Sequence, residues 1–141
     1  MSDPYDLERF VEAQAGGTYH RALDELTHGR KTSHWMWFIF PQVAGLGLSE
    51  MSVRYAIAGL DEARAYWQHP VLGIRYDECA QALLGLGDVA ITDVLGPVDT
   101  LKLHSSLTLF AEAAPQSAAI DELLMRHFGG EPDPATLRLL S

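Results

Sequence analysis

Hydrophobic residues recur every three or four positions along most of the chain, which is the spacing of an α-helix with one buried face. The clearest example runs from 70 to 85, where Leu72, Tyr76, Cys79 and Leu83 share a face. The same spacing predicts further helices or helical turns over residues 3–14, 18–28, 61–67, 100–113, 117–128 and 132–140. Apart from one short aromatic run, no segment alternates polar and apolar residues between hairpin turns, so no β-sheet is predicted.

Residues that favour helix ends flank these segments. Candidate N-caps are Asp3 (before Pro4), Thr18, Asp61, Asp99 and Ser117. Gly29 and Gly129 stand just past two predicted helix ends, where glycine is common. We therefore expect an all-α fold, with a single domain over residues 1–141 built as a compact orthogonal bundle of six to seven short helices.

Length and charge restrict the classes of protein that fit. The chain has 141 residues, 48% of them hydrophobic, and a formal net charge of −9. Long nucleic acids and anionic membranes require a basic surface, so neither is an expected partner. One cysteine, no signal peptide and no apolar run long enough to span a membrane favour a cytoplasmic location.

Lysine is unusually rare among the basic residues. Eight of the ten are arginine, and the two lysines are Lys31 and Lys102. Where arginine is this common, a lysine either survives by chance or serves as a compact point charge that a guanidinium cannot replace.

Common cofactor and metal motifs are missing from the sequence. Residues 45–50 lack the third glycine and the preceding strand of a dinucleotide fingerprint, and neither a phosphate loop nor a nucleophile elbow occurs. No two of the six histidines lie three to five residues apart, so no metal site is predicted, and no cofactor is assigned. Cys79 lies on an apolar helix face, which favours a buried hydrophobe over a nucleophile.

The run from Ser33 to Gln42 holds six consecutive apolar residues, among them Trp35 and Trp37. Such a run forms either an aromatic part of the core or the floor of a pocket. In the second case the indoles offer a stacking surface for a flat ligand, and His34 and Gln42 stand at its rim as polar contacts.

A glycine-rich turn follows the aromatic run. Residues 45–49 lead into a short helix that contains Ser52 and Arg54. Free backbone amides at such a helix start, together with these two side chains, suit a phosphate or carboxylate; an ordinary turn and N-cap explain the turn equally well. Residues 29–60 carry a net charge of +2, the reverse of the chain as a whole.

A third segment, residues 99–110, places Asp99, Lys102 and Ser106 along one helix face, with Ser105 beside them. A lysine one turn before two serines could activate a hydroxyl or hold an anion. Alternatively, Asp99 and Lys102 form a plain surface ion pair. No catalytic residue is assigned.

With these segments the chain resembles domain-of-unknown-function family 1810, nearly from end to end. The matching stretches are residues 3–11, 33–42, 55–57, 69–73 and 101–110. The most specific is His34-Trp-Met-Trp-Phe-Ile-Phe-Pro-Gln42, whereas Leu107 stands where the family is expected to have methionine. The resemblance implies an all-helical bacterial domain without a known activity. The label calpastatin, sometimes given to members, does not suit a chain with this much predicted core.

Two functions of different classes fit the sequence. The first is a small-ligand domain, or an enzyme of hydrolase or transferase type, whose aromatic pocket takes an anionic, nucleotide-like metabolite. Its candidate binding residues are His34, Trp35, Trp37, Gln42, Ser52, Arg54, Lys102, Ser105 and Ser106. The alternative is a protein-interaction or self-association module with exposed tryptophans. The sequence permits a homo-oligomer without predicting one.

Overall fold

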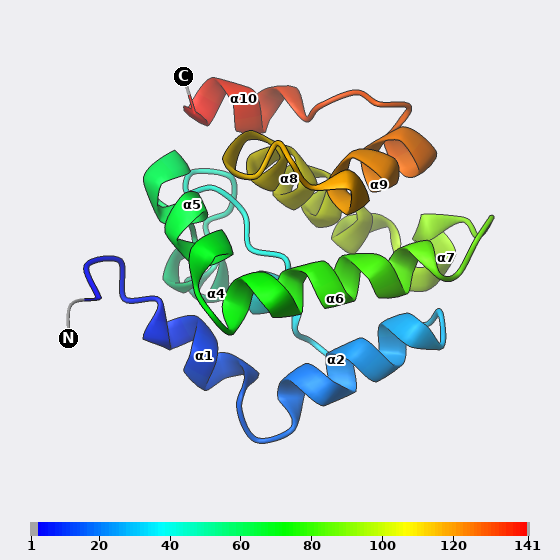
Figure 1. Cartoon of the computed structure of the whole chain (residues 1–141), viewed down its shortest axis with the longest axis horizontal. Coiled ribbons are helices and arrows are strands. Elements are labelled where there is room, and N and C mark those ends of the chain that lie inside the picture. Colours follow the sequence, from blue (N-terminus) through cyan, green and yellow to red (C-terminus); the bar gives the residue numbers. More distant parts are fainter. Residues whose placement is uncertain (1–2, 141) are drawn as a thin grey trace.

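The computed structural model describes residues 3–140 and confirms the all-α fold (Figure 1). Over these residues the chain forms ten helices. They are α1 (Glu8–Gln14), α2 (Thr18–Thr27), α3 (Met36–Ile39), α4 (Glu50–Arg54), α5 (Leu60–Gln68), α6 (Leu72–Leu84), α7 (Ile91–Leu95), α8 (Pro97–Ala113), α9 (Ala118–Phe128) and α10 (Pro134–Leu140). None of the helices in the described range is both long and apolar enough to cross a membrane.

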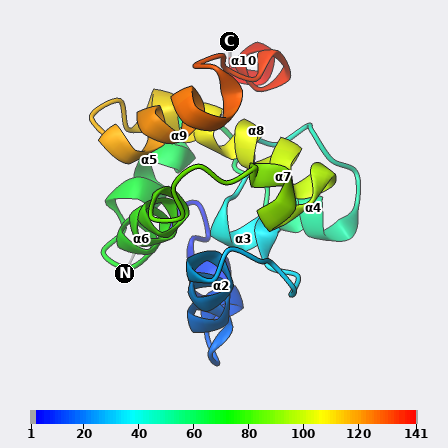
Figure 2. The same ribbon diagram turned by 90° about the vertical axis from the view of Figure 1, so that its right-hand side faces the viewer.

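The helices pack around α6 and α8. Helix α6 contacts α2 on one side and α5 and α9 on others, while α8 packs against α5, α7, α9 and α10. Both ribbon views place α2 at one end of the molecule and α10 at the opposite end (Figures 1 and 2). The two central helices meet through aromatic rings, with the centroids of Tyr76 and Phe110 4.4 Å apart. Tyr66 packs against both rings, so the centre of the core is aromatic.

The seven predicted helical segments all occur, but several of their ends differ from expectation. Ser117 caps α9 by accepting a hydrogen bond from the Ile120 N–H, and Gly29 follows α2 with a φ of 76°, as predicted. The caps predicted at Thr18 and Asp61 are wrong, because glycines precede both helices and each polar residue lies inside its helix.

The first helix starts later than the predicted segment 3–14. Asp3 accepts hydrogen bonds from the backbone N–H groups of Leu7 and Glu8. Its carboxylate therefore pairs amides at the start of α1 from beyond an intervening turn. Asp6 has a φ of 52°, which no α-helix accommodates, and α1 begins only at Glu8.

Three helices exceed the predicted six to seven: α3, α4 and α7. Each has four or five residues, which is too short for a hydrophobic repeat to appear. The start of α4 was expected, and Ser49 caps it as predicted by accepting a hydrogen bond from the Ser52 N–H. Helix α3 lies inside the aromatic run, where an unbroken apolar stretch has no distinct polar face.

The segment between α3 and α4 folds back on the chain after α4. Val43 and Ile57 form an isolated parallel bridge, in which the Ile57 N–H donates to the Gln42 carbonyl. The Ala44 N–H donates in turn to the Ile57 carbonyl. These bonds fix Gln42 and the start of the glycine-rich turn against the segment that follows α4. Within residues 3–140 no longer strand pairing occurs.

The corner between α5 and α6 should tolerate no side chain at Gly73. A Cβ atom there would lie 1.8 Å from the Trp67 carbonyl oxygen, which is backbone and cannot turn aside. We expect Gly73→Ala to lower the free energy of unfolding by about 3 kcal/mol, at the upper end of overpacking effects. The measurement is urea denaturation followed by circular dichroism.

Gly85→Ala is the matched control, because its Cβ would meet only ordinary contacts of 3.4 and 3.5 Å. Gly85 also has a right-handed φ of −63°, so alanine should leave stability unchanged or raise it by up to about 1 kcal/mol. Equal stabilities for the two variants would contradict the packing described for Gly73.

Candidate functional site

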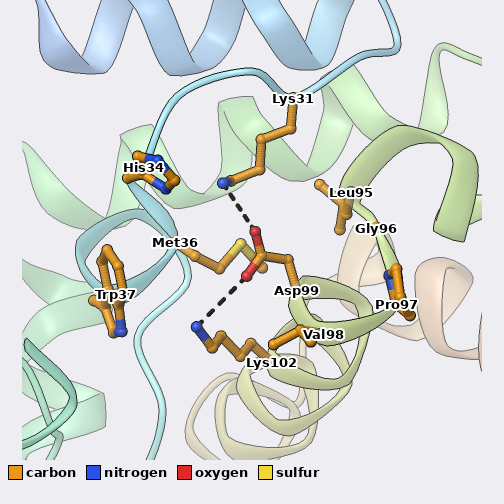
Figure 3. A pocket seen from close by; sticks show the side chains of 10 residues that line it. All are labelled: Lys31, His34, Met36, Trp37, Leu95, Gly96, Pro97, Val98, Asp99 and Lys102. Carbon is orange, nitrogen blue, oxygen red and sulfur yellow. Dashed lines mark ion pairs between the residues drawn. The ribbon is translucent and has the colours of Figure 1, made fainter. Parts of the chain in front are cut away.

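A first cavity lies where the start of α8 meets the loop after α2 and the short helix α3 (Figure 3). Its volume is about 300 Å³. The lining residues are Lys31, His34, Met36, Trp37, Leu95, Gly96, Pro97, Val98, Asp99 and Lys102. Two of the three segments singled out in the sequence thus meet here, and both lysines of the chain line one cavity.

Asp99 lies between the two lysines (Figure 3). The Lys31 Nζ is 2.8 Å from the Asp99 Oδ2, and the Lys102 Nζ is 3.5 Å from its Oδ1. Helix α8 begins at Pro97, two residues before the cap predicted at Asp99, so Asp99 and Lys102 are helical neighbours one turn apart. Two ammonium groups share one carboxylate, which leaves a local charge of +1.

The two lysines differ in how firmly they are held. The Lys31 side chain is only 7% exposed and also donates to the Ser33 carbonyl at 2.6 Å. The Lys102 side chain is 24% exposed, and within residues 3–140 its one ion pair is the longer contact with Asp99. Because an ammonium has three N–H donors, Lys102 keeps the larger unused capacity for an anion.

Glu25 fixes the loop that carries Lys31 and His34. Its Oε1 accepts hydrogen bonds from the backbone N–H groups of Thr32 and Ser33 and from the Trp35 indole, and its Oε2 accepts one from the Ser33 hydroxyl. Burial alone would raise the pKa of Glu25, but these hydrogen bonds outweigh it and lower the pKa to about 2. The carboxylate is therefore charged at neutral pH and holds the loop in place.

The two tryptophans of the aromatic run have different positions. Trp35 has no exposed surface and lines neither this cavity nor the others described below. Trp37 is half-buried, and the Lys102 Nζ lies 4.7 Å from the centre of its ring. Its indole N–H is buried and has no hydrogen-bond partner among the described residues.

Trp37 also lines a very small cavity of about 10 Å³, together with Gln42, Ser52, Tyr55 and Ala56. That volume accommodates about one water-sized group. Trp37, whose indole N–H is unpaired among the described residues, is thus one of the residues around this small space.

A second cavity of about 340 Å³ adjoins the first, because Val98 and Lys102 line both. Its other lining residues are Gln42, Leu46, Gly47, Ser52, Leu101, His104, Ser105, Asp133 and Ala135. We call the two cavities together the lysine groove. Each has a volume typical of a small-ligand pocket.

A chain of hydrogen bonds through the buried Thr136 connects Ser105 and Asp133, which both line the second cavity. The Thr136 hydroxyl donates to the Asp133 Oδ2 at 2.6 Å, and the Ser105 and Thr136 hydroxyl oxygens are 2.8 Å apart. Because Thr136 has a single hydroxyl proton, Ser105 must be the donor in the second bond. The Ser105 oxygen is thus left as an acceptor.

Of the candidate binding residues, six line the lysine groove: His34, Trp37, Gln42, Ser52, Lys102 and Ser105. Three do not. Trp35 is in the core, and Ser106 is buried with its hydroxyl 2.9 Å from that of Tyr76. Arg54 lies in the last turn of α4, exposed, and its Nε donates to the Tyr55 hydroxyl at 3.3 Å.

Sequence reasoning had placed Lys31, Asp133 and Thr136 in no site, and Glu25 had no assigned role. Lys31 alone had a usable signal, namely the scarcity of lysine. Asp133, just before α10, reaches the groove because α10 packs against α8, and the fully buried Thr136 hydrogen-bonds to both Asp133 and Ser105.

Metal ligands do not gather in the described part of the chain, where no three histidine, cysteine or acidic side chains are placed to hold an ion. Cys79 is buried in the core, and burial raises its pKa to about 12, so its thiol is neutral and unreactive at ordinary pH.

Comparisons with known proteins identify relatives whose descriptions name no activity. A family model described as "Protein of unknown function (DUF1810)" matches residues 4–140. The structure is similar to the crystal structure of the conserved hypothetical protein Rv1873 from Mycobacterium tuberculosis, with 48% sequence identity, 98% of each chain covered and a TM-score of 0.95. Among curated proteins no match is found.

The low pKa of Glu25 predicts a pH-dependent contribution to stability. A carboxylate whose pKa falls on folding stabilises the protein above its unfolded value of 4.5, and this contribution is lost as the pH falls toward 2. Glu25→Gln keeps one acceptor oxygen without the charge, so it should cost about 1–2 kcal/mol at pH 7. Denaturant unfolding from pH 7 to pH 2.5 should show this deficit shrinking with pH.

Asp24→Asn is the control, because it removes the same charge from an exposed neighbour whose side chain is 73% exposed. It should change stability by less than about 0.5 kcal/mol at neutral pH. A Glu25→Gln deficit that stayed constant down to pH 2.5 would show that the hydrogen bonds do not depend on the charge of Glu25.

Proposed function

Because the chain belongs to the DUF1810 family, whose description gives no function, we propose a function from the structure of the lysine groove. We propose that the groove binds a small anionic ligand of nucleotide size. Lys102 is the residue that contacts the anion. The proposal concerns binding, which is the step that a hydrolase, a transferase and a non-catalytic binding domain have in common.

The observation that carries the proposal is the meeting of both lysines across Asp99. In a chain of net charge −9, two ammonium groups and one carboxylate leave an excess positive charge in a cavity. A phosphate or carboxylate group would neutralise that excess. It would also use the N–H donors of Lys102 that the protein leaves unpaired.

Lys31 and Asp99 act as positioning residues in this arrangement. The shorter Lys31–Asp99 ion pair holds the carboxylate in place, and Asp99 orients Lys102 from one turn away. A preorganised ammonium group loses little side-chain entropy when the ligand arrives.

An interaction module without a ligand site has less support. That alternative requires exposed tryptophan anchors, whereas Trp35 has no exposed surface and Trp37 is half-buried. The exposed apolar residues beside the groove are Val98 and Leu101, at 63% and 70% exposure. They border a charged cavity, which suits the edge of a ligand site as well as a protein contact.

Lys102→Ala should abolish stabilisation by anionic ligands while leaving the unliganded protein almost unchanged. A ligand at a hundred times its dissociation constant stabilises a protein by about 2.7 kcal/mol. Thermal unfolding with inorganic phosphate, pyrophosphate and AMP should show this shift for the wild-type protein and none for Lys102→Ala. The free variant should lose under about 1 kcal/mol, because its ion pair is long and partly exposed.

Arg64→Ala is the matched control, since it removes an equal charge from an exposed pair with Asp61 outside the groove. It should respond to anions as the wild type does. If Lys102→Ala instead lowered the free energy of unfolding of the unliganded protein by several kcal/mol, Lys102 would be structural. If anions still stabilised this variant, they would bind elsewhere on the protein.

A further inference from the structure

We propose, on the basis of the anion site above, that the lysine groove recognises a sugar phosphate. The phosphate lies at Lys102 in the first cavity and the hydroxyl-bearing sugar lies in the second. In a nucleotide, the sugar and its phosphate would then provide the recognition, and the base would add little. The inference depends on the contrast between the two cavities.

The first cavity offers hydrogen-bond donors, whereas the second offers mainly acceptors. Asp133 uses its Oδ2 for Thr136, and its Oδ1 has no partner among the described residues. The Ser105 hydroxyl proton is directed to Thr136, so its oxygen accepts. Sugar hydroxyls are donors that match these acceptors, and a carboxylate is a usual partner of ribose hydroxyls.

Gln42 adds an amide that suits a hydroxyl as donor or acceptor. Its side chain lines the second cavity and makes no hydrogen bond with the part of the chain that the structure describes. The Ile57 N–H donates a hydrogen bond to the Gln42 carbonyl, so the backbone that carries the Gln42 side-chain amide is fixed in place. The Gln42 side-chain amide could therefore bind a ligand hydroxyl without breaking any hydrogen bond among the described residues.

The negative charge of Asp133 restricts the ligand further. A second phosphate in that cavity would face a carboxylate, and like charges close together are unfavourable. The groove therefore suits a ligand with an anionic end and a neutral, hydroxylated body, rather than a bisphosphate.

Aromatic stacking of a base is poorly supported by the same geometry. Trp35 is wholly buried, and Lys102 lies over the ring of Trp37. The ring of His104 is stacked on Phe128, with centroids 4.2 Å apart and an interplanar angle of 2°. Val98 and Leu101, which line the groove, offer a base apolar contact but no aromatic stacking.

The test compares inorganic phosphate, ribose 5-phosphate, ribose and AMP by isothermal titration calorimetry with the full chain. Ribose 5-phosphate should bind at least tenfold more tightly than phosphate, and AMP within about threefold of ribose 5-phosphate. Gln42→Ala and Ser105→Ala should each lower the ratio of ribose 5-phosphate affinity to phosphate affinity by threefold or more. Lys102→Ala should remove binding of every phosphorylated compound.

Ser106→Ala is the matched control for Ser105→Ala, because it truncates the adjacent buried serine, which faces Tyr76 and not the groove. It should leave the ratio unchanged. If Ser105→Ala fails to fold, Gln42→Ala tests the second cavity alone, since its amide is unpaired within residues 3–140.

The outcomes separate this inference from the proposed function. Phosphate binding that depends on Lys102, with ribose 5-phosphate no tighter, would overturn the sugar subsite and leave the anion site standing. AMP binding tenfold tighter than ribose 5-phosphate would also overturn it, because the base would then be recognised. No binding of any phosphorylated compound would overturn both.

Discussion

The ion pair between Lys31 and Asp99 is the contact on which the candidate site depends. It joins the loop after α2 to the first turn of α8, next to a backbone hydrogen bond from the Lys31 N–H to the Val94 carbonyl at the end of α7. With its side chain only 7% exposed, Lys31 would be costly to leave without a carboxylate partner, so the pair fixes the distance between the two segments. Glu25 prepares this contact by holding the loop through four hydrogen bonds. Glu25 thus positions the loop that carries Lys31, Lys31 positions Asp99, and Asp99 orients Lys102.

The local charge at this contact explains why an acidic protein could bind an anion in the way proposed above. Net charge governs long-range steering, which solvent ions screen over about 8–10 Å. Inside a cavity, the nearest groups decide, and there two ammonium groups face one carboxylate. The proposed ligand is therefore a small one, because a long polyanion would extend beyond the groove onto a chain of net charge −9.

The long helices could be predicted from the sequence because their hydrophobic spacing repeats. The short helices, the orientation of the two indoles and the residues that α10 adds to the site could not. Segments such as 70–85 have enough turns for their apolar face to show, whereas α3, α4 and α7 have too few residues. The aromatic run indicated a core or a pocket, but six adjacent apolar residues do not reveal which indole faces inward. That choice is made by Glu25, ten residues before Trp35, whose carboxylate draws the Trp35 indole into the core. Asp133 lines the second cavity because α10 packs on α8, and the buried Thr136 hydrogen-bonds to Asp133 and Ser105 at that contact; local sequence has no signal for this packing.

The start of α8 determines how one helix serves both cavities. Because the helix begins at Pro97, Asp99 and Lys102 lie one turn apart on the face toward the first cavity. Ser105 follows Lys102 by three residues on nearly the same face and reaches the second cavity, while Ser106, turned by a further 100°, meets Tyr76 in the core. A single helical face thus carries a carboxylate, an ammonium and a hydroxyl in succession. The spacing of 3.6 residues per turn therefore places the proposed anion-binding group and the proposed hydroxyl-binding group side by side, and the adjacent serine anchors the same helix in the core.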